Sequence, residues 1–191
     1  MTLSNQVFKD AMSHFPSGVT VITAYTSDNE LVGMTASAFI SVSLNPPLIL
    51  ESVAKNARMH EVLMQQDIYA VSILSDQQAN VSNHFAGWST EGFEPELCSL
   101  YGVPVIKESV ARLVCKIVNR VDAGDHTLFL GEVISAEIDE ESDSQTPLVY
   151  YNRDYYFPHR LPPSEPKRVP SSTQVHALDD SETPMTDPES K

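Results

Sequence analysis

The sequence predicts a mainly β protein, an antiparallel barrel with a few peripheral helices. Segments that are rich in β-branched residues, or that alternate apolar and polar residues, outnumber the segments with helical spacing. The helical segments fall near the start of the chain and between predicted strands. Polar turns join several successive strands into predicted hairpins.

The first third of the chain predicts a helix, a hairpin and a further strand. Residues 4–15 carry apolar side chains at helical spacing, and Ser4 is of a type that commonly caps helices. Residues 19–25 are rich in β-branched residues and predict a strand that turns back into a second one. The second strand ends at residues 45–47, Asn-Pro-Pro, because proline has no N–H to donate within a sheet. The apolar run 48–53 predicts the next strand.

The middle of the chain alternates helices with strands. Asn56 is a plausible N-cap for a helix whose buried face would carry Met59, Val62 and Leu63. Residues 68–74 predict a strand and residues 77–85 a second helix. Residues 88–101 have mixed polarity with several Gly and Pro residues, and they are interpreted as a loop with short turns.

The last part of the folded region predicts a long hairpin over residues 110–138, followed by a short strand at 148–151. Alternation in the first strand of this hairpin predicts two faces. The residues expected to face inward are Ala111, Leu113, Cys115, Ile117 and Val121, and those expected to face outward are Arg112, Lys116 and Arg120. Seven of the 13 prolines lie in 158–191, among polar and acidic residues. The sequence therefore predicts one domain over 1–157 and a tail over 158–191 that is either disordered or packed on a partner subunit.

Composition excludes several classes of function. The 191 residues include 26 acidic and 12 basic ones, for a net charge of −14, which argues against nucleic acid and against an anionic membrane surface. The two cysteines have no disulfide or metal-ligand spacing, and the six histidines are scattered, so no metal site is predicted. Neither a signal peptide nor a span of membrane length is recognisable, and the expected location is the cytoplasm.

Residues 33–47, GMTASAFISVSLNPP, hold small and hydroxyl side chains where a buried strand normally carries Val, Ile or Leu. Small residues let a bulky group lie against the backbone, where hydroxyls and free N–H groups can bind it. The alternative is an ordinary Ser/Thr-rich strand and turn. A second candidate feature is the cation pair Lys55 and Arg58 beside a predicted helix start, which suits a phosphate. Solvated surface cations are the alternative there, but residues 1–157 hold only eight Lys or Arg.

Three strings resemble the flavin reductase family, whose fold is the FMN-binding split barrel. The run 33–47 resembles that family's pattern G-M-T-x-S-A-F-x-S-V-S-x-x-P-P. Residues 124–133, GDHTLFLGEV, resemble G-D-H-T-x-F-x-G-E-V, and residues 147–151, PLVYY, resemble P-L-x-Y-Y. The strings occur in the family's order, and the resemblance covers residues 8–157. It implies an antiparallel split β-barrel.

The resemblance also implies a site. His126 is the candidate catalytic residue, placed to position the nicotinamide, with proton delivery as a weaker option and a purely structural histidine as the alternative. The following residues are the candidates for cofactor binding: Met34, Thr35, Ala36, Ser37, Ala38, Ser41, Ser43, Glu51, Ser52, Lys55, Asn56, Ala57, Arg58, Phe85, Ala86, Tyr151 and Asp154.

The implied activity is an NAD(P)H:flavin oxidoreductase that moves a hydride from NADH or NADPH to FMN or FAD and supplies reduced flavin to a partner monooxygenase. The cofactors carry that chemistry, so the protein has to place them. No G-x-G-x-x-G is present, so a Rossmann fold does not hold the nicotinamide. The family resemblance further implies a homodimer. The alternatives are a split-barrel flavoprotein that keeps its flavin and acts on another substrate, and a non-catalytic flavin-binding protein.

Overall fold

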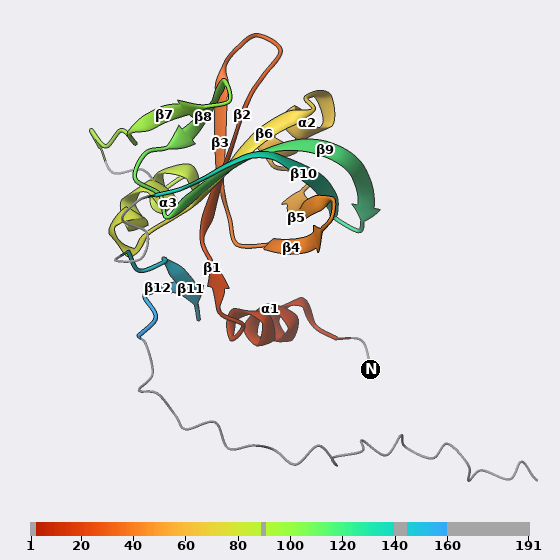
Figure 1. Ribbon diagram of the computed structural model, residues 1–191. Helices are drawn as coiled ribbons and strands as arrows, with labels where there is room; N and C mark the ends of the chain where they lie inside the picture. Colours follow the sequence, from red (N-terminus) through yellow and green to blue (C-terminus); the bar gives the residue numbers. More distant parts are fainter. Residues whose placement is uncertain (1–2, 89–90, 140–144, 160–191) are drawn as a thin grey trace, which may run out of the picture. The chain divides into compact units, whose positions relative to one another are not determined.

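The computed structural model describes residues 3–88, 91–139 and 145–159. Its main element is a seven-stranded sheet of order β3-β2-β6-β9-β10-β5-β4, in which all neighbours are antiparallel (Figure 1). The strands are β2 (Thr20–Tyr25), β3 (Leu31–Ala36), β4 (Phe39–Leu44), β5 (Pro47–Ala54), β6 (Ile68–Ile73), β9 (Ala111–Ala123) and β10 (His126–Ile138). The mainly β, antiparallel class predicted from the sequence is confirmed.

The sheet curls toward a barrel that stays open along one line. Strands β3 and β4 follow each other in the chain, separated only by Ser37 and Ala38, yet they lie at opposite edges of the sheet order. The sheet has to bend to bring these edges together, and the backbone N–H of Ser52 in β5 donates to the Ala38 carbonyl at 3.2 Å. The sequence predicted one strand here; the structure breaks it at the two small residues.

Strands in the middle of the sheet are covered on both faces. On one face, Ile22, Tyr69 and Cys115 belong to the largest core cluster. On the opposite face, Ala70 and Val114 pack with a separate hairpin, β7 (Leu97–Leu100) and β8 (Val103–Ile106). The prediction of loop and turns over residues 88–101 was therefore wrong in its last part. Mixed polarity hid a hairpin whose first strand alternates exposed and covered residues and whose second strand is buried throughout.

The β9–β10 hairpin departs from strict alternation at a bulge. Asn119 pairs with Leu130, but Ile117 pairs with Gly131, so Val118 is an extra residue in β9. A bulge reverses which residues face inward beyond it. The predicted faces of Arg120 and Val121 were wrong for this reason, since Val121 is exposed and Arg120 turns toward a helix end. The Arg120 guanidinium donates to the carbonyls of Leu63 and Gln66 at 3.0 and 2.9 Å.

The helices are α1 (Asn5–Ser13), α2 (Arg58–Gln65), the 3₁₀ turn η1 (Asp76–Gln78) and α3 (Ala79–Phe85). Ser4 caps α1 as predicted, with its hydroxyl accepting from the Val7 N–H at 3.2 Å. The buried face of α2 is confirmed, because Met59, Val62 and Leu63 all pack into the core. Asn56 is not its N-cap: that position is Ala57, which makes no side-chain cap.

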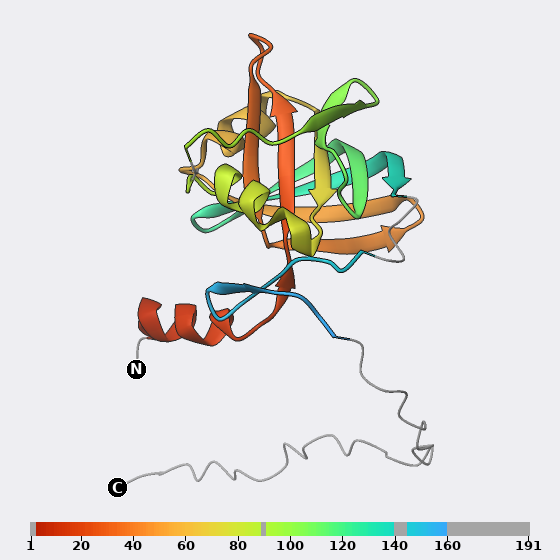
Figure 2. The ribbon, with the colours of Figure 1, turned by 90° about the vertical axis from the view of Figure 1, so that its left-hand side faces the viewer.

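A small sheet lies at one end of the barrel beside α1, as Figures 1 and 2 both show. It consists of β1 (Ser17–Gly18), β11 (Val149–Tyr151) and β12 (Asp154–Tyr156) in the order β1-β11-β12. The tail was predicted over residues 158–191, of which 160–191 lie outside the described residues. Among the helices of the described residues, none is long and apolar enough to cross a membrane.

Candidate functional site

A cavity of about 510 Å³ opens where three distant segments meet. Its floor comes from the end of β3, one wall from the last turn of α3 and the residues after it, and the other wall from the β11–β12 hairpin. The lining residues are Val19, Thr35, Ser37, Ser82, Asn83, Ala86, Trp88, Tyr150, Arg153, Asp154 and Tyr155. The volume is in the range of small-molecule sites, roughly 300–1,000 Å³.

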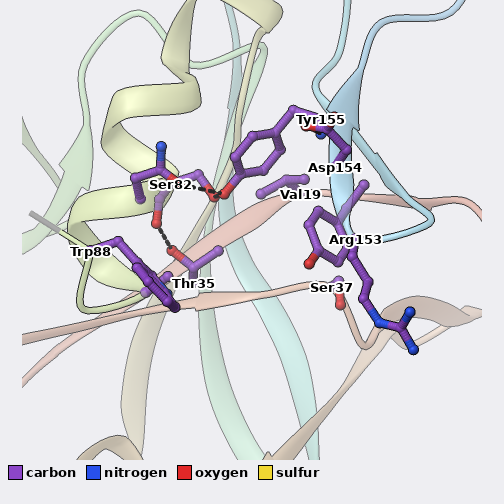
Figure 3. Close-up of a pocket in the computed structure, with 11 residues that line it drawn as sticks. Val19, Thr35, Ser37, Ser82, Trp88, Arg153, Asp154 and Tyr155 are labelled. Carbon is purple, nitrogen blue, oxygen red and sulfur yellow. Dashed lines mark hydrogen bonds between the residues drawn. The ribbon is translucent and has the colours of Figure 1, made fainter. Parts of the chain in front are cut away.

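A chain of hydrogen bonds fixes the three segments to one another (Figure 3). The Thr35 hydroxyl on β3 donates to the Ser82 carbonyl on α3 at 2.6 Å. The Ser82 hydroxyl and the Tyr155 hydroxyl on β12 lie 2.8 Å apart, and Tyr155 also donates to the Asn83 side-chain oxygen at 3.1 Å. Because Tyr155 has one proton to donate, Ser82 is the donor in their shared bond. The cavity walls are thus positioned before any ligand enters.

Gly33 allows α3 to approach β3 closely. A Cβ atom built on Gly33 would lie 2.2 Å from a ring carbon of Phe85, the last residue of α3. No real side chain tolerates that distance, so the glycine is required by the aromatic ring that lies on it. The first residue of the GMT string therefore serves the cavity indirectly, by letting the wall close on the floor.

The predicted small-residue run divides between core and cavity. Thr35 and Ser37 line the cavity, and Ser37 and Ala38 are exposed at the strand break. Met34 and Ala36 instead pack with the main core. Of the predicted residues at the end of α3, Ala86 lines the cavity and Phe85 packs on Gly33.

Four predicted residues lie on β4 and β5, outside the cavity lining. Ser41 is exposed, and Ser43 and Ser52 are half-buried. Glu51 is fully buried, and neither carboxylate oxygen has a hydrogen-bond partner among the described residues. Burial raises the pKa of this carboxyl well above its usual value. Its side chain cannot reach a ligand at the surface, so any contact with one would be through its backbone.

The predicted phosphate segment, residues 55–58, is at the surface and does not line the cavity. Lys55 pairs with Asp122 and donates to the Gly124 carbonyl at 2.7 Å, and Arg58 pairs with Glu30 at 2.8 Å. Asn56 is exposed and Ala57 packs on the core. Exposed ion pairs of this kind are worth about 0–1 kcal/mol, so a phosphate can displace the carboxylates. Phosphate binding there stays a prediction.

His126 lies beside the same segment. It is the first residue of β10 and pairs with Ala54 of β5, next to Lys55. Its Nδ1 is 2.7 Å from Asp125, a residue of the turn before the strand, and the hydrogen bond holds the pKa of that carboxyl below its usual value. The ring is 41 % exposed. Asp125 thus orients His126, and the ring is open to a ligand.

The C-terminal hairpin contributes more to the cavity than the sequence predicted. Asp154 lines the cavity, whereas Tyr151 lies in a separate apolar groove with Pro16 and Phe157. The prediction did not include Val19, Ser82, Trp88, Tyr150, Arg153 or Tyr155 among the binding residues. For Arg153 and Tyr155, the signal in the sequence was the polar turn after the PLVYY string. In the structure, Asn152 and Arg153 of that turn both have positive φ, as a tight hairpin turn requires.

The arrangement suits a flat, polar-edged ring. The floor has small side chains with hydroxyls, and aromatic residues with Arg153 and Asp154 form the walls. The sequence profile described as flavin reductase like domain matches residues 12–158. The chain belongs to the flavin reductase family. The split barrel predicted by resemblance is confirmed through the solved structures of this family.

Members of the flavin reductase family with known names resemble this chain over most of its length. An NADH-dependent FAD reductase of Streptomyces globisporus is 44% identical over 129 residues, which are 64% of this chain and 70% of the relative. The reductase component of 4-hydroxyphenylacetate 3-monooxygenase from Thermus thermophilus is 39% identical, over 78% of this chain and 94% of the relative. The solved structure of the flavin reductase PheA2 superposes with a TM-score of 0.77 at 42% identity, covering 83% of this chain and all of that one.

Proposed function

We propose that this protein is an NADH-dependent flavin reductase, taking FMN or FAD as the acceptor and supplying reduced flavin to a partner monooxygenase. The observation that supports it most is the family match over residues 12–158, in a chain where parts of two family strings line one cavity. Relatives named as NADH-dependent reductases and as a monooxygenase reductase component favour NADH over NADPH and a two-component system. We propose the cytoplasm as its location, because NADH is an intracellular metabolite.

When bound together, flavin and reduced nicotinamide supply the hydride chemistry, and the protein has to bind and orient them. Thr35 and Ser37 form a floor without bulky side chains, so a flat ring can lie against the β3 backbone. Ala86 and the end of α3 would limit its sideways movement, and Arg153 is the cation among the described residues that line the cavity. His126, oriented by Asp125, is proposed to position the nicotinamide from the β10 side. None of these residues is required as a nucleophile.

A turnover assay tests the proposal. Purified protein is mixed with FMN or FAD and with NADH or NADPH, and the loss of reduced-nicotinamide absorbance is followed for all four pairings. We expect oxidation of NADH that requires both protein and flavin. If none of the pairings gives flavin-dependent turnover, the proposed function is wrong. If flavin is retained through gel filtration without nicotinamide oxidation, the protein is a flavoprotein of another activity.

We also propose that the protein is a homodimer. Helix α1 has none of its residues buried, although its sequence carries an apolar stripe. Four large apolar side chains on and just after this helix are each more than half exposed: Val7, Phe8, Met12 and Phe15. An apolar groove of about 300 Å³ is formed by residues of β11 and β12, by Phe157 and Pro158 after them, and by Pro16. A second copy of the chain would remove both from water.

A further inference from the structure

Trp88 is the sole tryptophan of the chain, and it lies in a position that packing does not explain. Its side chain is 78 % exposed, although burying an indole stabilises a fold by several kcal/mol in area terms. It nevertheless lines the cavity, at the opposite side from Arg153 in Figure 3. A large aromatic face held at the rim of a polar cavity is the arrangement that stacks on a ligand ring.

The backbone holds Trp88 in place. Helix α3 ends at Phe85, and Gly87 takes a φ of +85°, the left-handed conformation that glycine adopts at helix ends. The Trp88 N–H then donates to the Asn83 carbonyl at 2.8 Å. The Asn83 side chain accepts from Tyr155, which ties this turn to β12. The indole is therefore presented on an anchored turn, so stacking on it costs little ordering entropy.

The exposure of Trp88 indicates which ring it meets. A ring that lies on the floor over Thr35 and Ser37 is inside the cavity, whereas a side chain that is mostly in water reaches only a part of the ligand that extends to the rim. FMN has a single ring system. FAD and NADH each have a second ring system, the aromatic adenine, at the far end of a pyrophosphate.

Charge supports a stacking role. Among the described residues that line the cavity, Arg153 is the single cation; it already pairs with Asp10, and Asp154 lies next to it. The lining therefore brings no excess positive charge to a pyrophosphate, in a chain of net charge −14. Uncharged contacts within the cavity therefore add to the affinity for such an anionic ligand, and base–aromatic stacking is worth about 1–3 kcal/mol per base.

We propose that Trp88 is the adenine-stacking residue of the cavity, and that it makes the site prefer a dinucleotide over its mononucleotide counterpart. The inference rests on the proposed function for the identity of the dinucleotide. The adenine belongs either to FAD or to the nicotinamide dinucleotide. The test distinguishes these two sources by comparing FAD with ADP-ribose, which carries the adenine end of the nicotinamide dinucleotide.

The test measures dissociation constants by calorimetry for FAD, FMN and ADP-ribose with the full chain and with Trp88→Ala and Trp88→Phe. If the adenine of FAD stacks on Trp88, Trp88→Ala weakens FAD by about tenfold or more and leaves FMN unchanged, and Trp88→Phe retains most of the affinity. If the adenine of the nicotinamide dinucleotide stacks there, Trp88→Ala instead lowers the affinity for ADP-ribose. The control is Tyr101→Asn, which removes an aromatic side chain that is 70 % exposed and outside the cavity lining. Asparagine tolerates the positive φ of that turn.

The contrary results are distinct. An equal loss for FMN and FAD would mean that Trp88 contacts the flavin ring, and unchanged affinity for all three ligands would mean that it contacts none; either overturns the inference while turnover persists. If the unaltered protein binds no flavin, the proposed function fails, and the ADP-ribose measurement still decides the role of Trp88. If it binds neither flavin nor ADP-ribose, both are wrong. Circular dichroism checks the fold of each variant.

Discussion

Ser37 is the residue on which the proposed flavin site depends most directly. It is exposed, it lines the cavity, and it follows β3 at the break in the strand. Ser37→Leu places a branched side chain where the ring is expected to lie. We expect flavin binding to fall below detection in a titration, with a change in unfolding free energy within about 0.5 kcal/mol, as at most surface positions. Normal flavin affinity in this variant would show that the flavin ring does not lie against Ser37.

His126 is expected to affect the rate more than the affinity. Its ring is open to ligand and oriented by Asp125, but it does not line the cavity. His126→Ala should slow hydride transfer in stopped-flow experiments by about 10- to 100-fold, the effect of misplacing a reactant, while the flavin dissociation constant changes by less than about threefold. Asp125→Asn, which keeps the side-chain oxygen that holds the ring, is the milder comparison. A loss of flavin affinity as large as the loss of rate would contradict the assignment.

Glu51 makes stability depend on pH. Burial raises its pKa in the folded state, so the folded protein keeps a proton that the unfolded chain releases above about pH 4.3. Stability therefore falls as the pH rises from that value toward the folded-state pKa, by at most about 1.4 kcal/mol per pH unit. In Glu51→Gln this contribution is absent.

Urea unfolding of both proteins between about pH 5 and pH 8 measures the effect of Glu51. We expect the stability of the unaltered protein relative to Glu51→Gln to decrease steadily with rising pH. Burial also raises the pKa of the nearby Cys115 thiol to about 12, so this thiol stays protonated in the folded protein across this window. A constant difference between the two proteins would show that Glu51 has an ordinary pKa.

At the scale of elements, the cavity exists because α3 closes on β3. Gly33→Ala forces the Phe85 ring away from a Cβ that would otherwise lie at 2.2 Å. We expect a loss of about 1–3 kcal/mol in unfolding free energy, typical of overpacking, and weaker flavin binding because the wall moves with Phe85. Gly18→Ala is the matched control, since its Cβ would meet nothing within 4 Å. Equal effects of the two substitutions would contradict this account.

At the scale of the whole molecule, the exposed apolar face of α1 predicts association. Light scattering at micromolar concentration should give twice the mass of one chain. Phe8→Asp should shift the protein toward the monomer without unfolding it, since that side chain is more than half exposed in the single chain. Lys9→Ala, a change at a polar residue of the same helix, should leave the mass unchanged. A monomer for the unaltered protein would refute the dimer.

Much of this fold could be predicted because local patterns decided it. β-branched runs marked β2 and β6, and helical spacing marked the buried face of α2. The errors came from effects that a local pattern does not contain. The bulge at Val118 reversed the faces of Arg120 and Val121, and the β7–β8 hairpin covers the second face of strands that otherwise resemble ordinary core strands.

Parts of the cavity lining were predictable where a family string coincides with it, as at Thr35 and Ser37, whereas Ala86 was a candidate only through the family resemblance. The lining was not predictable where the residue acts through tertiary geometry. Tyr155 contributes one hydroxyl that joins Ser82 and Asn83, more than 70 positions earlier in the chain. Met34 and Ala36 share the string with Ser37 but pack with the core, because the break in the strand comes only after Ala36.

The most direct test of the central claim is a crystal structure of the protein with FMN bound. The account predicts density for the tricyclic ring against the backbone at Thr35 and Ser37, between the end of α3 and the β11–β12 hairpin, with one face open to an incoming nicotinamide. Density for the ring elsewhere on the protein, with this cavity closed by side chains, would contradict it.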